Sequence, residues 1–260
     1  MSGLSAEEAG DADHPLVVVI HGSMDRSAGM LKLSRRLDMD YRVMRYDRRG
    51  YGRSFPHDGP YTMDFQVTDL VDLLAGRRGV LVGHSYGGNV ALATADQHPD
   101  LVAGVAVYET PLSWEEWWPG TTAGAIAVAE SGKPEEAAER FLRRMLGAAR
   151  WDALPERTKH TRRAEGIAMV EELADLRRHQ PWTAAHVSAA VVVAYGAEGA
   201  PHHRVGMQHA AALLGCPVVE LAGCRHDAPL SHPDLFRTEV IDPLMRRVGP
   251  PWSLVDGSSA

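Results

Sequence analysis

Four runs of consecutive apolar residues, each as long as a β-strand and rich in valine, mark the chain. They are Leu16 to Ile20, Gly79 to Val82, Val102 to Val107 and Ala189 to Tyr195. Because no polar residue interrupts them, they are typical of strands in a parallel sheet that is covered on both faces. Two weaker strand candidates flank them, at Tyr41 to Tyr46 and at Pro217 to Leu221.

Segments with helical spacing of apolar residues lie between these runs. They are Ser27 to Leu37, Met63 to Leu74, Tyr86 to Gln97, Val205 to Leu214 and Pro233 to Val248. Strand and helix therefore alternate along the chain. This alternation predicts an α/β fold with a doubly wound, mostly parallel sheet.

One long stretch breaks the alternation. Residues 111–186 contain no good strand candidate but three plausible helices, near Thr121 to Glu130, Pro134 to Ala149 and Arg162 to Arg178. We therefore expect a helical cap at 111–186, inserted into a core made of residues 14–110 and 187–249. The polar ends of the chain, residues 1–13 and 250–260, are expected to be poorly ordered.

Composition and charge narrow the classes of function. The 260 residues are 45% hydrophobic and 23% charged, close to a globular average, and their formal net charge is −7. No cluster of lysine and arginine is rich enough for a nucleic-acid surface. No apolar stretch approaches the ~20 residues that span a bilayer, and the acidic start of the chain is unlike a secretory signal. We expect a cytoplasmic protein that binds neither nucleic acid nor membrane; the sequence leaves its oligomeric state open.

The strongest chemical signal is Gly-His-Ser-Tyr-Gly at residues 83–87, between a predicted strand and a predicted helix. It matches G-x-S-x-G in the context that gives the pattern its meaning, a sharp turn that lifts the serine hydroxyl out of the sheet. A serine hydroxyl is a weak nucleophile until an imidazole accepts its proton. Ser85 is therefore the candidate nucleophile, and a histidine later in the chain is needed as its base.

At this point the sequence resembles the α/β-hydrolase superfamily over nearly the whole chain outside residues 111–186 and the termini. The His-Gly-Ser at residues 21–23 is similar to the family's oxyanion turn, and the segment at residues 47–54 to its D-x-R-G-x-G-x-S loop. Gly-Cys-Arg-His at residues 223–226 resembles its histidine loop. The resemblance implies that His226 is the base, and that the order of serine, acid and histidine is the one this fold uses.

The resemblance leaves the acid open, because glycine stands at position 199, where many relatives have aspartate. Glu109, which follows the strand Val102 to Val107, is the favoured candidate, since some members of the family carry their acid there. Glu198 is the alternative. For the oxyanion hole we expect the backbone N–H groups of Tyr86 and Ser23, with Met24 as a substitute for Ser23.

The substrate pocket and the cofactors follow from the remaining residues. Trp114, Trp117 and Trp118 stand where the cap begins, and they either roof an apolar pocket above Ser85 or only anchor the cap. His84 is expected in the pocket wall. Adjacent residues such as His202 and His203 diverge and make a poor metal pair, and no nucleotide motif is present, so neither metal nor organic cofactor is implied.

Together these features predict a hydrolase that cleaves an ester or related acyl bond of a small, apolar acyl substrate through an acyl-enzyme. A carbon–carbon bond hydrolase or a lactonase would use the same residues. A ligand-binding protein that has lost turnover is the alternative from another class, and the missing aspartate favours it. Reaction of Ser85 with a serine-directed phosphonate would separate the enzyme from the binding protein.

Overall fold

The computed structural model describes residues 3–130 and 132–249. Within them, seven strands form one sheet in the order β1-β3-β2-β4-β5-β6-β7. The β1 strand pairs antiparallel with β3, and every other neighbouring pair is parallel. This confirms the expected α/β fold with a mostly parallel sheet. The strands are β1 (Ala6–Ala9), β2 (Leu16–Ile20), β3 (Arg42–Tyr46), β4 (Gly79–His84), β5 (Val102–Tyr108), β6 (Ala190–Gly196) and β7 (Val218–Leu221).

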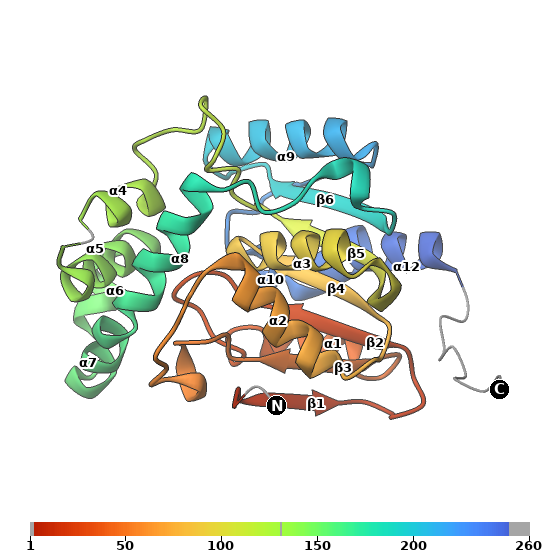
Figure 1. The fold of residues 1–260 in the computed structure, drawn as a ribbon, viewed down its shortest axis with the longest axis horizontal. Helices are drawn as coiled ribbons and strands as arrows, with labels where there is room; N and C mark the ends of the chain where they lie inside the picture. The colour runs from red at the N-terminus through yellow and green to blue at the C-terminus, as the bar shows by residue number, and fades with distance from the viewer. Residues whose placement is uncertain (1–2, 131, 250–260) are drawn as a thin grey trace.

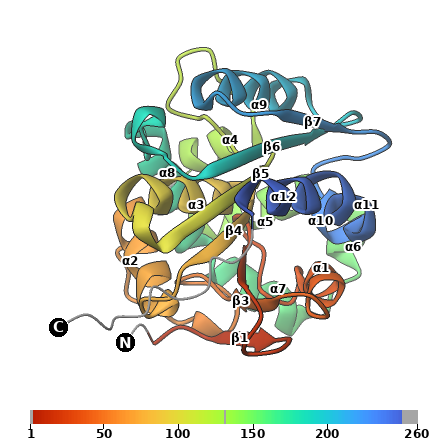
Figure 2. The ribbon, with the colours of Figure 1, turned by 90° about the vertical axis from the view of Figure 1, so that its right-hand side faces the viewer.

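Helices cover both faces of this sheet (Figures 1 and 2). One face carries α1 (Leu31–Leu37), α10 (Ala228–Ser231), α11 (Pro233–Phe236) and α12 (Asp242–Val248), and the other carries α2 (Met63–Leu74), α3 (Tyr86–Gln97) and α9 (Pro201–Leu214). In β2, Val17 and Val19 pack into the first layer while Val18 and Ile20 pack into the second. Successive side chains of a strand point to opposite faces, so a sheet buried twice needs uninterrupted apolar runs.

Between β5 and β6 the described residues form five α-helices, which lie beside the sheet at the left of Figure 1. The sequence predicted three, and the difference has a local cause. Gly147 has a φ of 87°, a left-handed conformation that ends one helix and lets another begin at Ala148. A further helix starts after Pro155, which suits a helix start because proline has no N–H to donate. The five are α4 (Ala123–Ala129), α5 (Pro134–Leu146), α6 (Ala148–Asp152), α7 (Glu156–Ala164) and α8 (Gly166–Arg178).

The predicted helix from Pro233 to Val248 is also interrupted. The π-helical turn η4 (Arg237–Ile241) separates α11 from α12. Pro243, near the start of α12, has no N–H for a regular helical bond, which favours a widened turn just before it. Short 3₁₀ turns complete the described elements: η1 (Gly52–Ser54), η2 (Pro99–Leu101) and η3 (Ala184–His186).

The N-terminal segment was expected to be poorly ordered, and this expectation is wrong for its described part. The β1 strand adds an antiparallel edge to the sheet, although its sequence, Ala-Glu-Glu-Ala, has no apolar alternation. Ion pairs attach this strand to β3, because Glu7 pairs with Arg45 and Glu8 pairs with Arg42. Residues 1–2 and the predicted tail at 250–260 lie outside the described residues.

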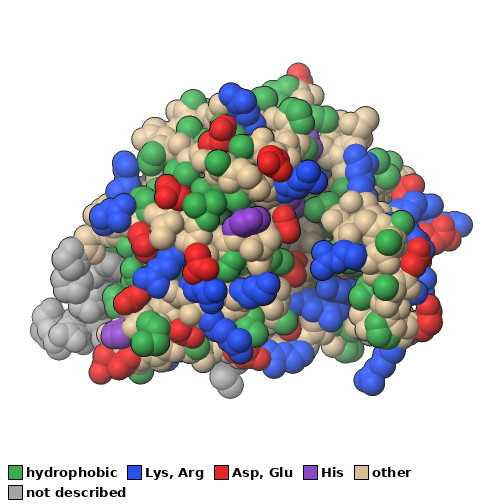
Figure 3. Space-filling view, turned by 180° about the vertical axis from the view of Figure 1, so that it is seen from behind, with side chains coloured by type: hydrophobic (Ala, Val, Ile, Leu, Met, Phe, Trp, Pro, Cys, Tyr) green, Lys and Arg blue, Asp and Glu red, His purple; other side chains and the backbone are tan. Residues whose placement is uncertain are grey.

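The surface mixes both signs of charge. On the face opposite to that of Figure 1, acidic and basic side chains are interspersed (Figure 3). Among the helices of residues 3–130 and 132–249, none is both long and apolar enough to cross a membrane.

Candidate active site

A pocket of about 90 Å³ lies between the carboxyl ends of the central strands and the α4–α8 helices. The sheet side contributes Ser85 and Tyr86, which follow β4, and His226, which follows β7. The other wall is mainly apolar and includes Trp118, Phe141 and Leu173. The pocket therefore joins a polar floor to an apolar wall.

Ser85 stands on the sharp turn that the sequence predicts. Its φ of 53° and ψ of −124° are strained for a residue with a side chain, and its N–H donates to the carbonyl of Tyr108 at 2.8 Å. A Cβ at Gly83 would lie 2.4 Å from the carbonyl oxygen of Gly87, and one at Gly87 would lie 2.4 Å from that of Ile20. The flanking glycines are therefore required for the turn that exposes the serine.

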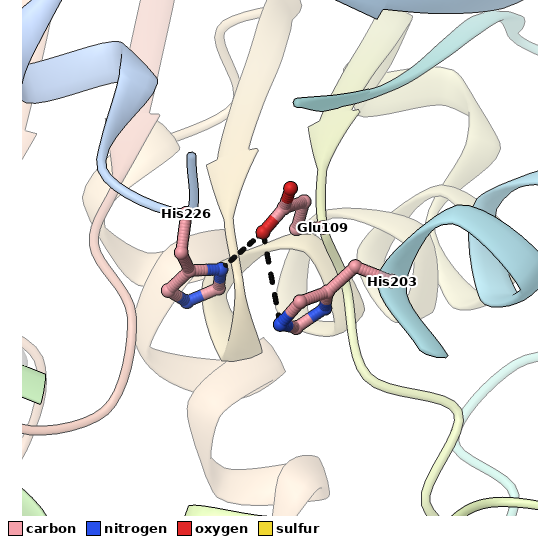
Figure 4. A group of neighbouring side chains, drawn as sticks. All are labelled: Glu109, His203 and His226. Atoms are coloured by element: carbon pink, nitrogen blue, oxygen red, sulfur yellow. Dashed lines mark hydrogen bonds and ion pairs between the residues drawn. The ribbon is translucent and has the colours of Figure 1, made fainter. Parts of the chain in front are cut away.

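His226 and Glu109 form a hydrogen-bonded pair (Figure 4). The Nδ1 of His226 lies 2.7 Å from Oε2 of Glu109. Glu109 is fully buried, and its Oε1 accepts the N–H of Gly196 at 2.9 Å. A carboxylate accepts only, so Nδ1 carries the proton and Nε2 of His226 is left as an acceptor. This is the tautomer that a general base beside a serine requires.

The backbone at Glu109 is unusual as well. Its φ of 47° lies in the left-handed region, which an ordinary residue enters only when its surroundings enforce it. Directly after β5, its N–H donates to the carbonyl of Ala194 on β6 at 3.0 Å. The strain occurs where the chain must turn a carboxylate from the end of β5 towards the loop of His226.

A second histidine shares the same carboxylate. The ring of His203, on α9, stacks on that of His226 with 4.7 Å between centroids and an interplanar angle of 16° (Figure 4). Its Nε2 lies 3.6 Å from Oε2 of Glu109. Burial, and then the charge that His226 can carry, hold the pKa of His203 well below its ordinary value. His203 therefore stays neutral and leaves the carboxylate charge to His226.

Among the described residues, the same three side chains form the group that could hold a metal ion, since one ligand atom from each lies within 4.8 Å of the others. Two ligands of one tetrahedral zinc lie roughly 3.3 Å apart when each is ~2.0 Å from the metal. The 2.7 Å between His226 and Glu109 is shorter than this and is the length of a charge-assisted hydrogen bond. The arrangement fits a proton between these atoms better than a metal.

Two side chains from the central strands hold the histidine loop by its backbone. The Nε2 of His84 lies 2.8 Å from the carbonyl oxygen of His226, and the Tyr108 hydroxyl donates to that of Arg225 at 2.7 Å. Burial first, and then His226, lower the pKa of His84 to about 3. A neutral His84 can donate one hydrogen bond steadily, so it fixes the loop without competing for the charge of Glu109.

On the other side of Ser85, a buried ion pair anchors the turn that contains Ser23. Glu172 on α8 and Arg48 are both fully buried, with Nη1 of Arg48 2.7 Å from Oε2 of Glu172. The Ser23 and Tyr51 hydroxyls donate to Oε1 of Glu172 at 2.6 and 2.7 Å. The Ser23 side chain is thereby engaged away from the pocket floor, while the residue itself still lines the pocket.

The structure separates the two candidate acids. Glu198 lies in an exposed turn, where its Oε2 is 3.7 Å from Nε of Arg225, whereas Glu109 contacts His226. The candidate oxyanion donors separate as well. Ser23 and Tyr86 line the pocket, but the buried Met24 does not, and its carbonyl accepts from Arg162 at 2.9 Å.

The expectation for the tryptophans and His84 needs correction. Of the three tryptophans, Trp118 lines the pocket, whereas Trp117 is 40% exposed and Trp114 packs edge-on against Trp182. Consecutive residues of an irregular segment point in different directions, so three nearby rings do not make one roof. His84 lies behind His226, at the end of β4, rather than in the pocket wall.

Sequence reasoning missed Glu172 and Arg177, the second a pocket-lining residue on α8. It also set His203 aside with His202 as a diverging pair, which is wrong, because both residues line the pocket with 4.2 Å between their ring centroids. Glu172 and Arg177 belong to a helix that the sequence shows only as rich in Glu and Arg. Leu173 and Arg177 are four residues apart and therefore lie on one face of the helix. This spacing is the one sequence signal that could have placed Arg177 beside an apolar pocket residue.

Known proteins agree with this fold. The pattern of the Alpha/beta hydrolase family matches residues 17–239. Epoxide hydrolase 4 of Mus musculus is 31% identical over 108 residues, which cover 40% of this chain and 30% of that protein. The 2-(acetamidomethylene)succinate hydrolase of Mesorhizobium japonicum is 28% identical over 172 residues, covering 65% and 59%.

Among solved structures, a thermophilic esterase from Thermogutta terrifontis superposes with a TM-score of 0.75 at 22% identity, covering 95% of this chain and 94% of that one. Fold and site together define an α/β protein with a serine on a strand-to-helix turn. The chain belongs to the alpha/beta hydrolase family. The matched segment spans under a third of the epoxide hydrolases, so their activity does not pass to this chain by likeness alone.

Proposed function

We propose that the protein is a serine hydrolase that cleaves a carboxylic ester or a related acyl bond through an acyl-enzyme. The observation that carries the proposal is that His226, which lines one pocket with Ser85, is hydrogen-bonded at 2.7 Å to the buried Glu109 behind it. The α4–α8 helices act as its cap, because Phe141 and Leu173 on them close the apolar wall.

The roles follow from the geometry. Ser85 attacks the acyl carbon while Nε2 of His226 takes the hydroxyl proton, and Glu109 stabilises the imidazolium that forms. The N–H of Tyr86, at the start of α3, lacks a partner within the helix and is a donor for the oxyanion. The N–H of Ser23 is the second donor. His226 then passes its proton to the leaving group, and water releases the acyl group by the same steps in reverse.

The nucleophile favours acyl chemistry over epoxide opening, the activity in the name of several relatives. A serine hydroxyl that opened an epoxide would leave an ether on the enzyme, and a general base does not help water to cleave an ether. Attack on an ester leaves an acyl-serine, which water cleaves readily. Esters, lactones and activated carbon–carbon bonds beside a carbonyl all fit this restriction.

Labelling and substitution test the proposal. A fluorophosphonate should modify Ser85, as read by intact mass and peptide mapping, and Ser85→Ala should lower turnover of 4-nitrophenyl esters by at least about 10³-fold. Ser85→Ala should melt like wild type, and Ser188→Ala, at an exposed serine, is the matched control. Retention of a tenth of the activity in Ser85→Ala, or a failure of Ser85 to react, would end the serine mechanism and favour a ligand-binding protein.

A further inference from the structure

Arg177 stands out among the residues that line the pocket because nothing balances its charge. It belongs to the last turn of α8 and is half-buried, and its Nη1 is shielded from solvent with no hydrogen-bond partner in the described residues. A buried guanidinium N–H without an acceptor is unfavourable, so such groups are normally paired. Here the side that remains open is the pocket itself.

The other residues of the pocket do not supply the missing partner. Within residues 3–130 and 132–249, its lining contains no aspartate or glutamate, and Glu172, five residues earlier on α8, is already bonded to Arg48, Ser23 and Tyr51. In the part of the chain that the structure describes, Arg177 is thus the one permanently charged side chain that lines the pocket. The pocket of a protein whose net charge is −7 is itself cationic.

A purely structural role does not account for this placement. A cation in the last turn of a helix offsets the partial negative charge of the helix end. The next residue, Arg178, supplies a cation at the same end from an exposed position. That role therefore leaves the buried nitrogen of Arg177 without an explanation.

The position of Arg177 indicates that it contacts the acyl group of the substrate rather than the leaving group. His226 must protonate the leaving group, so the leaving group lies on the His226 side of Ser85. That side opens into an outer cavity of about 390 Å³, which does not include Arg177. The residues that this cavity shares with the pocket are Thr122, Ala123, Met145, His202, His203 and His226. Arg177 instead lies with Leu173 and Phe141 on the inner wall, where the acyl group would sit.

The outer cavity favours the same sign of substrate. Arg144 and Arg225 line it together with one acid, Glu198, which is paired with Arg225. Clefts lined by one sign of charge draw in ligands of the opposite sign. An anion would therefore meet cations both at the entrance and on the inner wall.

We infer that Arg177 binds a carboxylate carried by the acyl group, so that the preferred substrates are acyl compounds of dicarboxylic acids, with one carboxyl esterified and the other free. This inference rests on the proposed hydrolase function and names its substrate class. Arg177 is a specificity-determining residue here. A guanidinium suits the role because its fork of N–H donors matches the two oxygens of a carboxylate.

A pair of esters of equal chain length tests the inference. Mono-4-nitrophenyl adipate has a free terminal carboxylate, and 4-nitrophenyl hexanoate has the same six carbons without it. Wild type should cleave the adipate ester with a kcat/KM at least about tenfold higher. Arg177→Met should remove this preference while changing the hexanoate by less than about twofold, and Arg177→Lys should restore part of it. The matched control is Arg178→Met, the exposed neighbour, which should leave both rates unchanged.

Two outcomes overturn the inference while leaving the hydrolase intact: a wild type that prefers hexanoate, or an Arg177→Met variant that slows both esters equally. A third ester, 4-carboxyphenyl hexanoate, places the charge on the leaving group and should show no dependence on Arg177. Dependence there would assign the carboxylate to the wrong side and refute the acyl assignment.

Binding to an inactive variant separates failure of this inference from failure of the proposed function. Monomethyl adipate should raise the Tm of Ser85→Ala more than methyl hexanoate does, and adding Arg177→Met should abolish the difference. If wild type cleaves no ester but this binding difference persists, the hydrolase proposal fails and the carboxylate site stands. If the two ligands shift Tm equally, the carboxylate site is refuted.

Discussion

Two fully buried carboxylates flank the β4 strand that precedes Ser85: Glu109 follows β5 on one side, and Glu172 binds residues that follow β2 and β3 on the other. Their partners differ in one respect. Glu109 contacts the imidazole of His226, with His203 beside it, and we call these three residues the Glu109 region. Glu172 contacts the guanidinium of Arg48, with Ser23 and Tyr51 beside it, and we call these four the Glu172 region. A guanidinium is charged at every working pH, whereas an imidazole gains its charge only when it takes a proton.

Because of this difference, Glu109 is suited to a role in catalysis and Glu172 to a role in stabilising the fold. In the Glu172 region, burial is the largest single influence on the pKa of Arg48 and acts to lower it, but the charge and hydrogen bond of Glu172, together with Tyr51 and Tyr86, outweigh it and hold that pKa above its ordinary value. The pair is satisfied at rest. In the Glu109 region the carboxylate is balanced fully only once His226 becomes positive, as it would when Ser85 attacks. The carboxylate of Glu109 therefore stabilises the imidazolium of His226 that forms together with the tetrahedral intermediate.

The largest expected effect comes from removing the charge of Glu109. Glu109→Gln should lower kcat for an ester by roughly 10³–10⁴-fold, because the amide permits the wrong tautomer of His226 and cannot stabilise the imidazolium. Its Tm should stay near that of wild type, since the amide oxygen can still accept the N–H of Gly196. Steady-state kinetics and thermal melting measure the two effects.

Glu198→Gln is the matched control, because Glu198 is exposed and paired with Arg225. It should retain most of the activity. A silent Glu109→Gln with a crippled Glu198→Gln would reverse the assignment of the acid.

The opposite result is expected for the Glu172 region. Glu172→Gln leaves Arg48 buried without a counter-charge, and breaking such a pair costs about 3–5 kcal/mol of unfolding free energy. The loss should appear in urea unfolding, and the folded fraction should keep more activity than Glu109→Gln. Glu171→Gln, at the exposed neighbouring position, should be close to neutral.

Adding Arg48→Met to Glu172→Gln removes the unpaired charge and should recover part of the lost stability. A double variant no more stable than Glu172→Gln would show that Arg48 acts through its packing on Tyr51 and Tyr86 rather than through its charge.

The two regions also differ in how well the sequence predicts them. The valine-rich strands and the helices Met63–Leu74 and Tyr86–Gln97 could be placed from pattern alone, because burial on both faces demands an uninterrupted run and G-x-S-x-G occupies one kind of turn. Glu109 could be proposed because its position at the end of a strand limits where its side chain goes.

Glu172, His203 and Arg177 could not be predicted in the same way. Glu172 meets Arg48 across 124 residues, and nothing in a helix rich in Glu and Arg distinguishes it from Glu171. The number of helices between β5 and β6 was also underestimated, because Gly147 and Pro155 act as local breaks that helical periodicity does not count. Long-range pairing and short helix breaks are the two features that the pattern leaves undetermined.

The pH dependence of stability tests the role of His84, which contacts the backbone of His226 in the Glu109 region. Burial lowers the pKa of His84 from 6.5 to about 3. Between pH 6.5 and pH 3, His84 is therefore protonated in the unfolded chain but neutral in the folded protein. The stability that depends on neutral His84 is therefore present above about pH 6.5 and is lost as the pH falls towards 3, amounting to about 2 kcal/mol by pH 5.

His84→Gln keeps an N–H donor for the carbonyl of His226 but removes the titration. The fall in Tm between pH 8 and pH 5 should be smaller in this variant than in wild type. His160→Gln, at an exposed position, should not alter the pH dependence. Equal acid sensitivity in wild type and His84→Gln would show that other groups cause it.

The smallest expected effect is at the apolar wall that faces both regions. Trp118 lines the pocket and is 5% exposed, whereas the adjacent Trp117 is 40% exposed and lies outside the pocket lining. Trp118→Phe keeps an aromatic ring but removes part of the apolar contact, which is worth about 1 kcal/mol. KM for 4-nitrophenyl hexanoate should rise by about three- to tenfold, with little change for the acetate, whose acyl group is too short to reach the wall. Because the lost contact weakens ground and transition states alike, kcat should change less than KM.

Trp117→Phe is the matched control and should change KM for neither ester. Equal effects of the two substitutions on both esters would instead assign the tryptophans to anchoring the helices.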